Sequence, residues 1–459
     1  MTQTPASTPT AAARAATPLR PPRRSPSDLP FRFPDAALAE RLATERGEPE
    51  WLRADRLAAA AAYDALPVEG NQLYTPYVDL RAAVLDEAEP YILDGPAELG
   101  DDLRAIEPGS LPDGVQVETM SQWLERDPDA FRRAIEGGAS LPEDDKLAQL
   151  ARGFWSHGRH VEVGAGIKLE RPIALRWPAA APGRALITRT IVTIGDGASA
   201  SIVEELVPCG PSIECAEAET VPQGFFHGTT EAILGAGSSL AFASIQEFEG
   251  GQVTFQHRRA QIGEGAAMQW ALAQLGGRLV RSRVDNRLEG DRSTVDQVEI
   301  VFGGEQQFFD LTSYTRHIGR DTTGNLLSKG ALLDRARSYM KGLITIEKSA
   351  IGTDSFLGEF GMNLSRATRA VAIPSLEIDQ PDCRRVAHAS SVGPIDPTQL
   401  FYLESRGIDP DEARKFIVLG FLEPVVARVP LESARERLRE LLEEKWAAGV
   451  AAAEASAAA

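Results

Sequence analysis

The segment PDCRRVAHASSVGPID, residues 381–396, places a cysteine five positions ahead of a histidine and then runs into Gly-Pro and Asp-Pro. Thiolate and neutral imidazole are both good metal ligands, so Cys383 and His388 are the first candidates for metal chemistry. The chain has three cysteines, six histidines and no C-x-x-C motif, so it lacks a full thiolate ligand set. Two hypotheses follow. His388 is one ligand of a site that another protein completes, or it is packed at a structural boundary and satisfied by the backbone.

The other histidines give weaker signals. The H-x-x-H spacing of His157 and His160 suits a metal-binding helical turn, but the glycine between them weakens a helix. We therefore predict surface or capping positions for this pair. His227 and His257 are predicted to lie at turns of the chain.

The composition of the 459 residues limits the classes of function. A formal net charge of −18 argues against non-specific binding to nucleic acid, which needs lysine and arginine to neutralise phosphates. No apolar run approaches the ~20 residues that cross a bilayer, and the N-terminus lacks the apolar core of a secretory signal. Cys209, Cys215 and Cys383 are too few for a disulfide framework, and we interpret the first two as free thiols. A reducing compartment, the cytoplasm, is the expected location.

Residues 1–30 are predicted to form a disordered tail, because they are rich in Thr, Ser, Pro and Ala. An organelle transit peptide has a similar composition and is the alternative. Residues 31–158 are predicted to be mainly helical. The stretch PEWLRADRLAAAAAYDALP, for example, has Pro49 at a helix start and Pro67 as a stop.

Residues 159–393 carry a recurring phrase with two glycines. Its four clear copies are Val163-Gly164-Ala165-Gly166, Ile194-Gly195-Asp196-Gly197, Leu234-Gly235-Ala236-Gly237 and Ile262-Gly263-Glu264-Gly265. A run with alternating apolar residues, typical of a strand, follows most copies. Repetition at this period indicates a mainly β solenoid, a parallel β-helix, in which each coil buries its face on the next. A β-sandwich would also show strands bounded by glycine, but it is not expected to repeat one turn phrase.

Residues 394–447 are predicted to form a C-terminal helical domain. Asp396-Pro397 and Asp409-Pro410 each supply an N-cap carboxylate followed by proline at the first helical position. A third helix carries Leu438, Leu441 and Leu442 on one stripe, and residues 448–459 are expected to be a flexible Ala-rich tail. The apolar helices are predicted to cap the last coil of the solenoid, with a docking site for a partner as the alternative.

The segments NLLSKGALLDRARSYMKGLITIEKSAIGTDS and AHASSVGPIDPTQLFYLESRGIDPDEARKFIVLGF resemble the SufB/SufD family of iron–sulfur cluster assembly scaffolds. Ala387 and Ala389 flank His388, where the SufB type usually has glutamates. The SufD type commonly has a cysteine at the position of Val386. The chain is therefore similar to SufD, with the histidine retained and the cysteine position changed.

The resemblance implies a right-handed parallel β-helix that pairs with a SufB-like paralogue, a homodimer being the alternative. It also implies a SufC ATPase recruited by the C-terminal helices, and a transient Fe–S cluster shared with the partner subunit. The chain has no Gly-x-x-x-x-Gly-Lys-[Ser/Thr] motif, so we expect a non-catalytic scaffold whose ATP is hydrolysed by SufC.

The resemblance assigns His388 as a cluster ligand at the subunit interface, with Cys383 as a weaker candidate. Five apolar residues of the C-terminal helices are candidates for cap packing or for contact with the ATPase: Leu400, Phe401, Phe416, Leu419 and Phe421.

A second function class remains open. Asp310, Arg316, Arg320 and Asp321 suggest a carboxylate and arginine site of the kind used by β-helix enzymes that act on polysaccharides, with Ca²⁺ held by oxygens. The alternative hypothesis is therefore a solitary polysaccharide-active enzyme or glycan-binding module.

Overall fold

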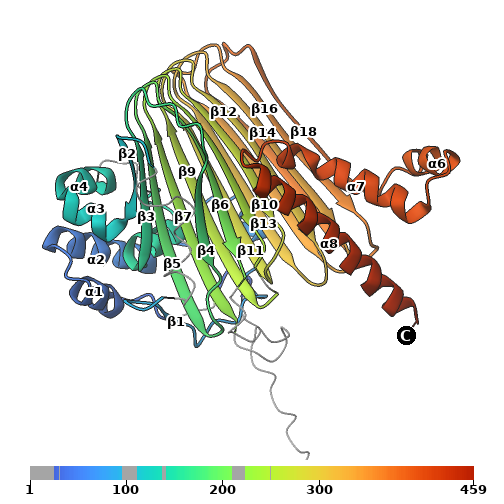
Figure 1. Cartoon of the computed structure of the whole chain (residues 1–459), viewed down its shortest axis with the longest axis horizontal. Helices are drawn as coiled ribbons and strands as arrows, with labels where there is room; N and C mark the ends of the chain where they lie inside the picture. Colours follow the sequence, from blue (N-terminus) through green and yellow to red (C-terminus); the bar gives the residue numbers. More distant parts are fainter. Residues whose placement is uncertain are drawn as a thin grey trace, which may run out of the picture.

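A computed structural model describes residues 25–29, 32–95, 111–136, 141–208, 223–248 and 250–458. Cys209, Cys215 and most of the predicted N-terminal tail lie outside these residues. The chain is mainly β, with a parallel β-solenoid of about 8 turns between N-terminal and C-terminal helices (Figure 1). The predicted fold class is confirmed.

Two sheets form the walls of the solenoid, and the chain alternates between them. Their neighbouring strands run parallel, except that β2 pairs antiparallel with β3. One sheet, in the order β17-β15-β13-β11-β9-β7-β5-β3-β2 with β1 paired to β5, comprises β1 (Glu89–Pro90), β2 (Val115–Thr119), β3 (His157–Val163), β5 (Arg184–Ile194), β7 (Gly224–Leu234), β9 (Gln252–Ile262), β11 (Leu279–Leu288), β13 (Phe308–His317), β15 (Arg337–Ile346) and β17 (Arg369–Ile378). The other, in the order β18-β16-β14-β12-β10-β8-β6-β4, comprises β4 (Ile173–Pro178), β6 (Ser199–Val207), β8 (Ser239–Gln246), β10 (Ala267–Gln274), β12 (Thr294–Gly303), β14 (Thr323–Leu332), β16 (Asp354–Asn363) and β18 (Arg385–Gly393).

The repeated two-glycine phrase forms one corner of successive coils. The amide of Gly195 donates to the carbonyl of Val163 at 2.8 Å, and the amide of Gly235 donates to that of Ile194 at the same distance. The second glycine of each phrase, such as Gly237 with φ +63°, adopts the left-handed conformation that side chains disfavour. The first glycine packs against the backbone of the preceding coil, where a Cβ on Gly195 would lie 2.5 Å from the amide nitrogen of Ala165.

The N-terminal region covers the outer face of the ten-stranded sheet. Its helices are α1 (Ala36–Glu45), α2 (Glu50–Ala65), the short 3-10 helix η1 (Thr75–Tyr77), α3 (Met120–Arg126), α4 (Pro128–Glu136) and α5 (Lys146–Phe154). Arg56 of α2 is fully buried; it bonds both carboxylate oxygens of Glu48 and the carbonyls of Gly153 and Trp155. Its guanidinium also lies over the Trp155 ring, 4.4 Å from the centroid. One buried cation thus joins α2 to the end of α5, and its charge is paired, as burial requires.

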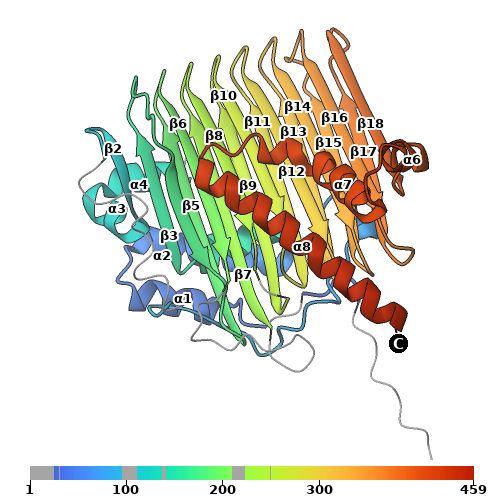
Figure 2. The same ribbon diagram turned by 45° about the vertical axis from the view of Figure 1, so that its right-hand side comes forward.

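The C-terminal helices are α6 (Pro397–Ser405), α7 (Pro410–Val426) and α8 (Glu432–Ala458), and α8 continues through the segment predicted to be a flexible tail. Asp396 and Asp409 cap α6 and α7 as predicted, since each carboxylate accepts a backbone amide of the first turn. Helices α7 and α8 lie across the outer face of the eight-stranded sheet (Figures 1 and 2). The apolar residues that they bury there against the strands are Val418, Leu422, Val425, Val426, Ala434, Leu438 and Leu442.

The prediction that these helices cap the last coil is therefore wrong. The outer face of the eight-stranded sheet carries apolar side chains, among them Ala243, Val298 and Ile300, and the apolar stripes of the helices pack on them. The apolar stripe of the helices was predicted correctly, but the surface on which it packs was not.

A carboxylate lies inside the solenoid, one coil before its end. Glu359 of β16 is fully buried, and its Oε2 accepts the amide of Ile373 at 2.7 Å. Burial raises the pKa of Glu359 to about 8, although the Ile373 hydrogen bond and the nearby Lys341 charge act in the opposite direction. Glu359 is therefore mostly protonated at neutral pH.

We predict that Gly195→Ala destabilises the chain by roughly 2 kcal/mol or more, because its new methyl group meets backbone that cannot move aside. The measurement is the midpoint of denaturant unfolding. Gly420→Ala is the matched control, since no atom lies within 4 Å of the added Cβ in α7. The control is expected to be neutral or slightly stabilising. Equal midpoints for the two variants would contradict the stacked-corner account.

We also predict a pH effect from Glu359. Between pH 4.5 and about 8 the folded chain holds a proton on this side chain that the unfolded chain releases. Stability must then fall as the pH rises through this window, by at most about 1.4 kcal/mol per pH unit. Glu359→Gln removes this contribution, so unfolding midpoints measured from pH 5 to 8 should decline less in the variant. Parallel pH profiles for the two proteins would show that Glu359 is ionised in the fold.

Candidate functional site at the open end of the solenoid

The last coil of the solenoid ends in two strands that have one free edge each. Strands β17 and β18 are the terminal strands of their sheets, and each pairs on one side only, with β15 and β16. Their outer edges lie at the same end of the molecule (Figure 2). Such edges pair readily with strands of another chain unless they are covered.

The interior face of this last coil is also uncovered. On β17 the residues in register with the buried Met340, Ile344 and Ile346 are Ala372, Leu376 and Ile378. These three residues are half-buried or exposed, and Ile378 is 48% exposed. In every earlier coil such inward positions are covered by the next coil, so the apolar interior is unfinished here.

His388 lies on the same interior face. The register of β18 places it beside Leu357 of β16, whose side chain is buried, and in line with Val386 and Val392. His388 is nevertheless exposed, because no further coil follows. It makes no hydrogen bond or ion pair with any other residue that the structure describes. The imidazole therefore stands at the mouth of the solenoid and is free to bind a ligand from outside.

The other five histidines are buried or half-buried, and each has a partner. His160 stacks on Trp123, with ring centroids 3.5 Å apart. His227 bonds two backbone carbonyls, His257 lies 2.5 Å from Asp285, and His317 bonds two hydroxyls. Burial lowers the pKa of His227 and of His317 to about 4, so both are neutral structural residues.

Two expectations for the histidines were wrong. His227 and His257 lie within strands β7 and β9 rather than at turns, and His160 is a buried residue of β3. The N-terminal helices provide partners for His160 and His227, and Asp285 of the neighbouring strand β11 provides one for His257. These long-range contacts leave no local sequence signal.

The surroundings of Cys383 do not favour metal binding. It precedes β18, is half-buried, and packs against the apolar cluster around Leu326, Ile344 and Leu357. Its thiol donates to the carbonyl of Gln380 at 3.0 Å. Burial and the neighbouring Asp382 raise the pKa of the thiol, which disfavours the thiolate that binds metal. The structure describes no contact between Cys383 and His388.

The five predicted partner-binding residues fall into two groups. Leu419 and Phe421 are partly buried against the apolar cluster under α7, and the Lys329 ammonium lies over the Phe421 ring. Leu400 is half-buried, whereas Phe401 is 71% and Phe416 57% exposed. Tyr402, which the sequence reasoning missed, is exposed as well. We call Phe401 and Tyr402 of α6 and Phe416 of α7 the aromatic patch of α6 and α7; exposed aromatic residues on two consecutive helices were the signal for it.

The residues of the alternative enzyme hypothesis do not converge on one site. Asp310 is buried in ion pairs with Arg281 and Lys341, at 2.7 and 2.5 Å. Asp321 lies at a corner and pairs with Arg384. Within the described ranges no three His, Cys, Asp or Glu side chains are grouped so that they could hold a metal ion. None of the helices in those ranges is long and apolar enough to cross a membrane.

The comparisons with known proteins agree with this architecture. The family model for the SufBD core domain of SUF system FeS cluster assembly matches residues 178–421. The iron–sulfur cluster assembly protein SufD of Bacillus subtilis is 28% identical over 304 residues, which are 66% of this chain and 67% of that protein. SufB of the same organism is 25% identical over 328 residues, 71% of this chain and 68% of that protein.

Two SufBD family proteins of Mycobacterium leprae also match. One is 29% identical over a region that covers 48% of this chain and 58% of that protein. The other is 24% identical over a region that covers 64% of this chain and 33% of that protein. The chain thus spans only part of these two relatives. Because the family model covers more than half of the chain, the chain belongs to the SufB/SufD family of the SUF system for iron–sulfur cluster assembly.

Proposed function

We propose that the chain is a SufD-like, non-catalytic scaffold subunit that pairs through its open end with a SufB-like subunit. The observation that carries this proposal is the unfinished last coil. Free strand edges and a half-exposed apolar interior occur together on β17 and β18, and a second solenoid can cover both at once. Edge pairing supplies backbone hydrogen bonds, and burial of residues such as Leu376 and Ile378 supplies apolar area.

The cluster would be assembled as a transient cargo of the pair. His388 stands within this proposed interface and can supply one imidazole nitrogen. Thiolates would come from the partner, since Cys383 packs against the apolar cluster and burial raises the pKa of its thiol. Among the residues described, no acceptor fixes the tautomer of the His388 ring. The partner would have to supply that acceptor too.

We further propose that the aromatic patch of α6 and α7 docks a SufC-type ATPase. Phe401, Tyr402 and Phe416 are exposed, while the opposite side of α7 is anchored to the eight-stranded sheet. Aromatic side chains are typical anchors of protein interfaces. Phe416 lies on the anchored helix α7, whereas Phe401 and Tyr402 lie on α6, which has no buried residue. Because α7 rests on β10, β12 and β14, force applied at the patch would be transmitted to the solenoid wall.

We predict that Ile378→Asp abolishes pairing with the SufB-like subunit, because it places a charge in the apolar centre of the interface. The measurement is the mass of the complex by light scattering or native mass spectrometry. Leu73→Asp is the matched control, since Leu73 is exposed to a similar extent, 53%, in the N-terminal region. If Ile378→Asp still forms a complex of normal mass, the open end is not the interface. If the native chain forms a homodimer that is lost only in Ile378→Asp, the chain pairs with itself through this end.

We predict that His388→Ala leaves the fold and the complex intact but lowers the yield of assembled cluster at least severalfold, because one ligand is missing. Absorbance of the reconstituted complex and iron analysis measure the yield. Ser390→Ala, two residues along on the same face of β18, is the control. Normal cluster yield in His388→Ala, at normal complex abundance, would return His388 to a packing role.

We predict that Phe401→Ser together with Phe416→Ser weakens binding of the ATPase more than about tenfold, since removal of central aromatic anchors commonly costs 2 kcal/mol or more. Pull-down and calorimetry with the isolated ATPase measure this loss. Pairing with the SufB-like subunit should persist, which separates the two proposed interfaces. Leu93→Ser is an exposed apolar control in the N-terminal region. Unchanged ATPase affinity in the double variant would place the docking site elsewhere.

A further inference from the structure

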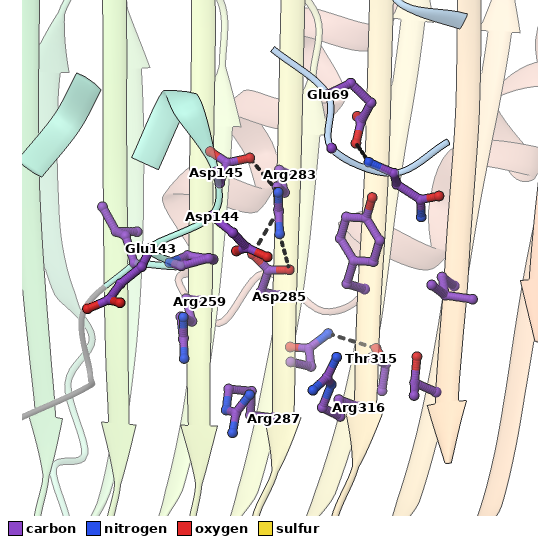
Figure 3. A pocket seen from close by; sticks show the side chains of 18 of the residues that line it. Glu69, Glu143, Asp144, Asp145, Arg259, Arg283, Asp285, Arg287, Thr315 and Arg316 are labelled. Carbon is purple, nitrogen blue, oxygen red and sulfur yellow. Dashed lines mark hydrogen bonds and ion pairs between the residues drawn. The ribbon is translucent and has the colours of Figure 1, made fainter. Parts of the chain in front are cut away.

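A large cavity lies on the other side of the molecule from the C-terminal helices. It has a volume of about 1030 Å³, is partly open to solvent, and lies between residues 66–72 and 141–145 of the N-terminal region and the outer face of the ten-stranded sheet. Strands β9, β11, β13 and β15 form its floor (Figure 3). Its size is that of a cavity for a small organic ligand.

Several charges in this cavity are already paired. Arg283 lies between Asp285 and Asp145, at 2.9 and 2.5 Å, and its guanidinium covers the Tyr314 ring. Glu69 pairs with Arg281 at 2.9 Å. These pairs attach the N-terminal segments to the sheet, and Arg283 is shared by two carboxylates.

Three further arginines on the floor have guanidinium donors that form no hydrogen bond with the described residues. We call Arg259 of β9, Arg287 of β11 and Arg316 of β13 the arginine floor. In the described part of the chain Arg259 makes no hydrogen bond or ion pair, and its Nε is buried without a partner. Arg287 and Arg316 each make one ion pair, with Glu289 and Glu347, both of which lie just beyond strand ends. Most of the guanidinium donors of the floor are therefore unused.

The arginine floor brings like charges close together. Arg287 and Arg316 are direct register neighbours on adjacent strands, where like charges repel. Burial lowers the pKa of Arg259; the nearby Asp285 charge acts in the opposite direction, and the Arg287 charge acts in the same direction as burial. A bound anion would remove both costs, because it would satisfy the free donors and offset the repulsion.

We propose that this cavity binds a small organic anion whose phosphate or carboxylate group is held by the arginine floor. Guanidinium groups bind both head groups through paired hydrogen bonds, so the shared chemistry is a compact anionic group with acceptor oxygens. Glu143 and Asp144 stand on the covering loop, whereas the arginines rise from the strands (Figure 3). These carboxylates disfavour a long polyanion and suit a ligand that turns hydroxyl or amino donors toward the loop.

The experiment titrates the isolated full-length chain with inorganic pyrophosphate and, separately, with citrate, by calorimetry and by thermal shift. Binding should weaken with added salt, as expected for a partly exposed charged site. The double variant Arg259→Gln with Arg287→Gln should bind at least about tenfold more weakly, a loss of about 1.4 kcal/mol. The probe that binds and is lost in the variant identifies the head group, phosphate or carboxylate.

Arg176→Gln together with Arg292→Gln is the control, because it removes the same net charge from two arginines outside the cavity, each paired with one glutamate. Circular dichroism and the melting temperature without ligand confirm that each variant folds. Unchanged affinity in the floor variant, equal losses in the control, or no binding of either probe to the native chain at about 10 mM would overturn the proposal. The test needs no partner subunit, so its result is independent of the proposed pairing.

Discussion

The structure depends on one constraint: each coil of a parallel solenoid buries its interior face on the next coil, and the last coil has none. Along the stack, residues such as Met340 and Ile344 are fully buried by this means. At β17 and β18 the same positions carry Leu376, Ile378 and Val392, which are half-buried or exposed. The apolar residues and the free backbone edges at this end are left to solvent or to another chain, and this is the surface that we propose binds the partner.

This constraint also explains why one histidine differs from the other five. The imidazoles within the stack or beneath the N-terminal helices acquire partners as a consequence of packing, and burial lowers the pKa of His157, His227 and His317 to about 4. His388 occupies an interior position of the register but faces no following coil. An exposed, unpartnered imidazole on an apolar end is poorly explained as a structural residue and well suited to a ligand shared with another subunit.

The sequence predicted the solenoid because its corners are local. The two-glycine phrase recurs at the positions that the structure pairs by hydrogen bonds, from Val163 to Ile194 to Leu234. The caps at Asp396 and Asp409 were predictable for the same reason, since an N-cap and its amide lie within two residues. The packing of α7 and α8 on a sheet face was not predictable, because an apolar stripe does not specify its target. The grouping of Arg259, Arg287 and Arg316 into the arginine floor was not predicted either. These residues are spread over 57 positions of the sequence, and only the register of the strands brings them together.

The most direct test of the account is amide hydrogen exchange of β17 and β18, measured for the isolated chain and for the chain with its SufB-like partner. In the isolated chain the amides on the free edges of these strands should exchange faster than those of β11 and β12 in the middle of the stack. Partner binding should slow exchange at β17 and β18 and leave the middle strands unchanged. A complex of the expected mass in which β17 and β18 exchange as fast as before would contradict the claim that the unfinished coil is the interface.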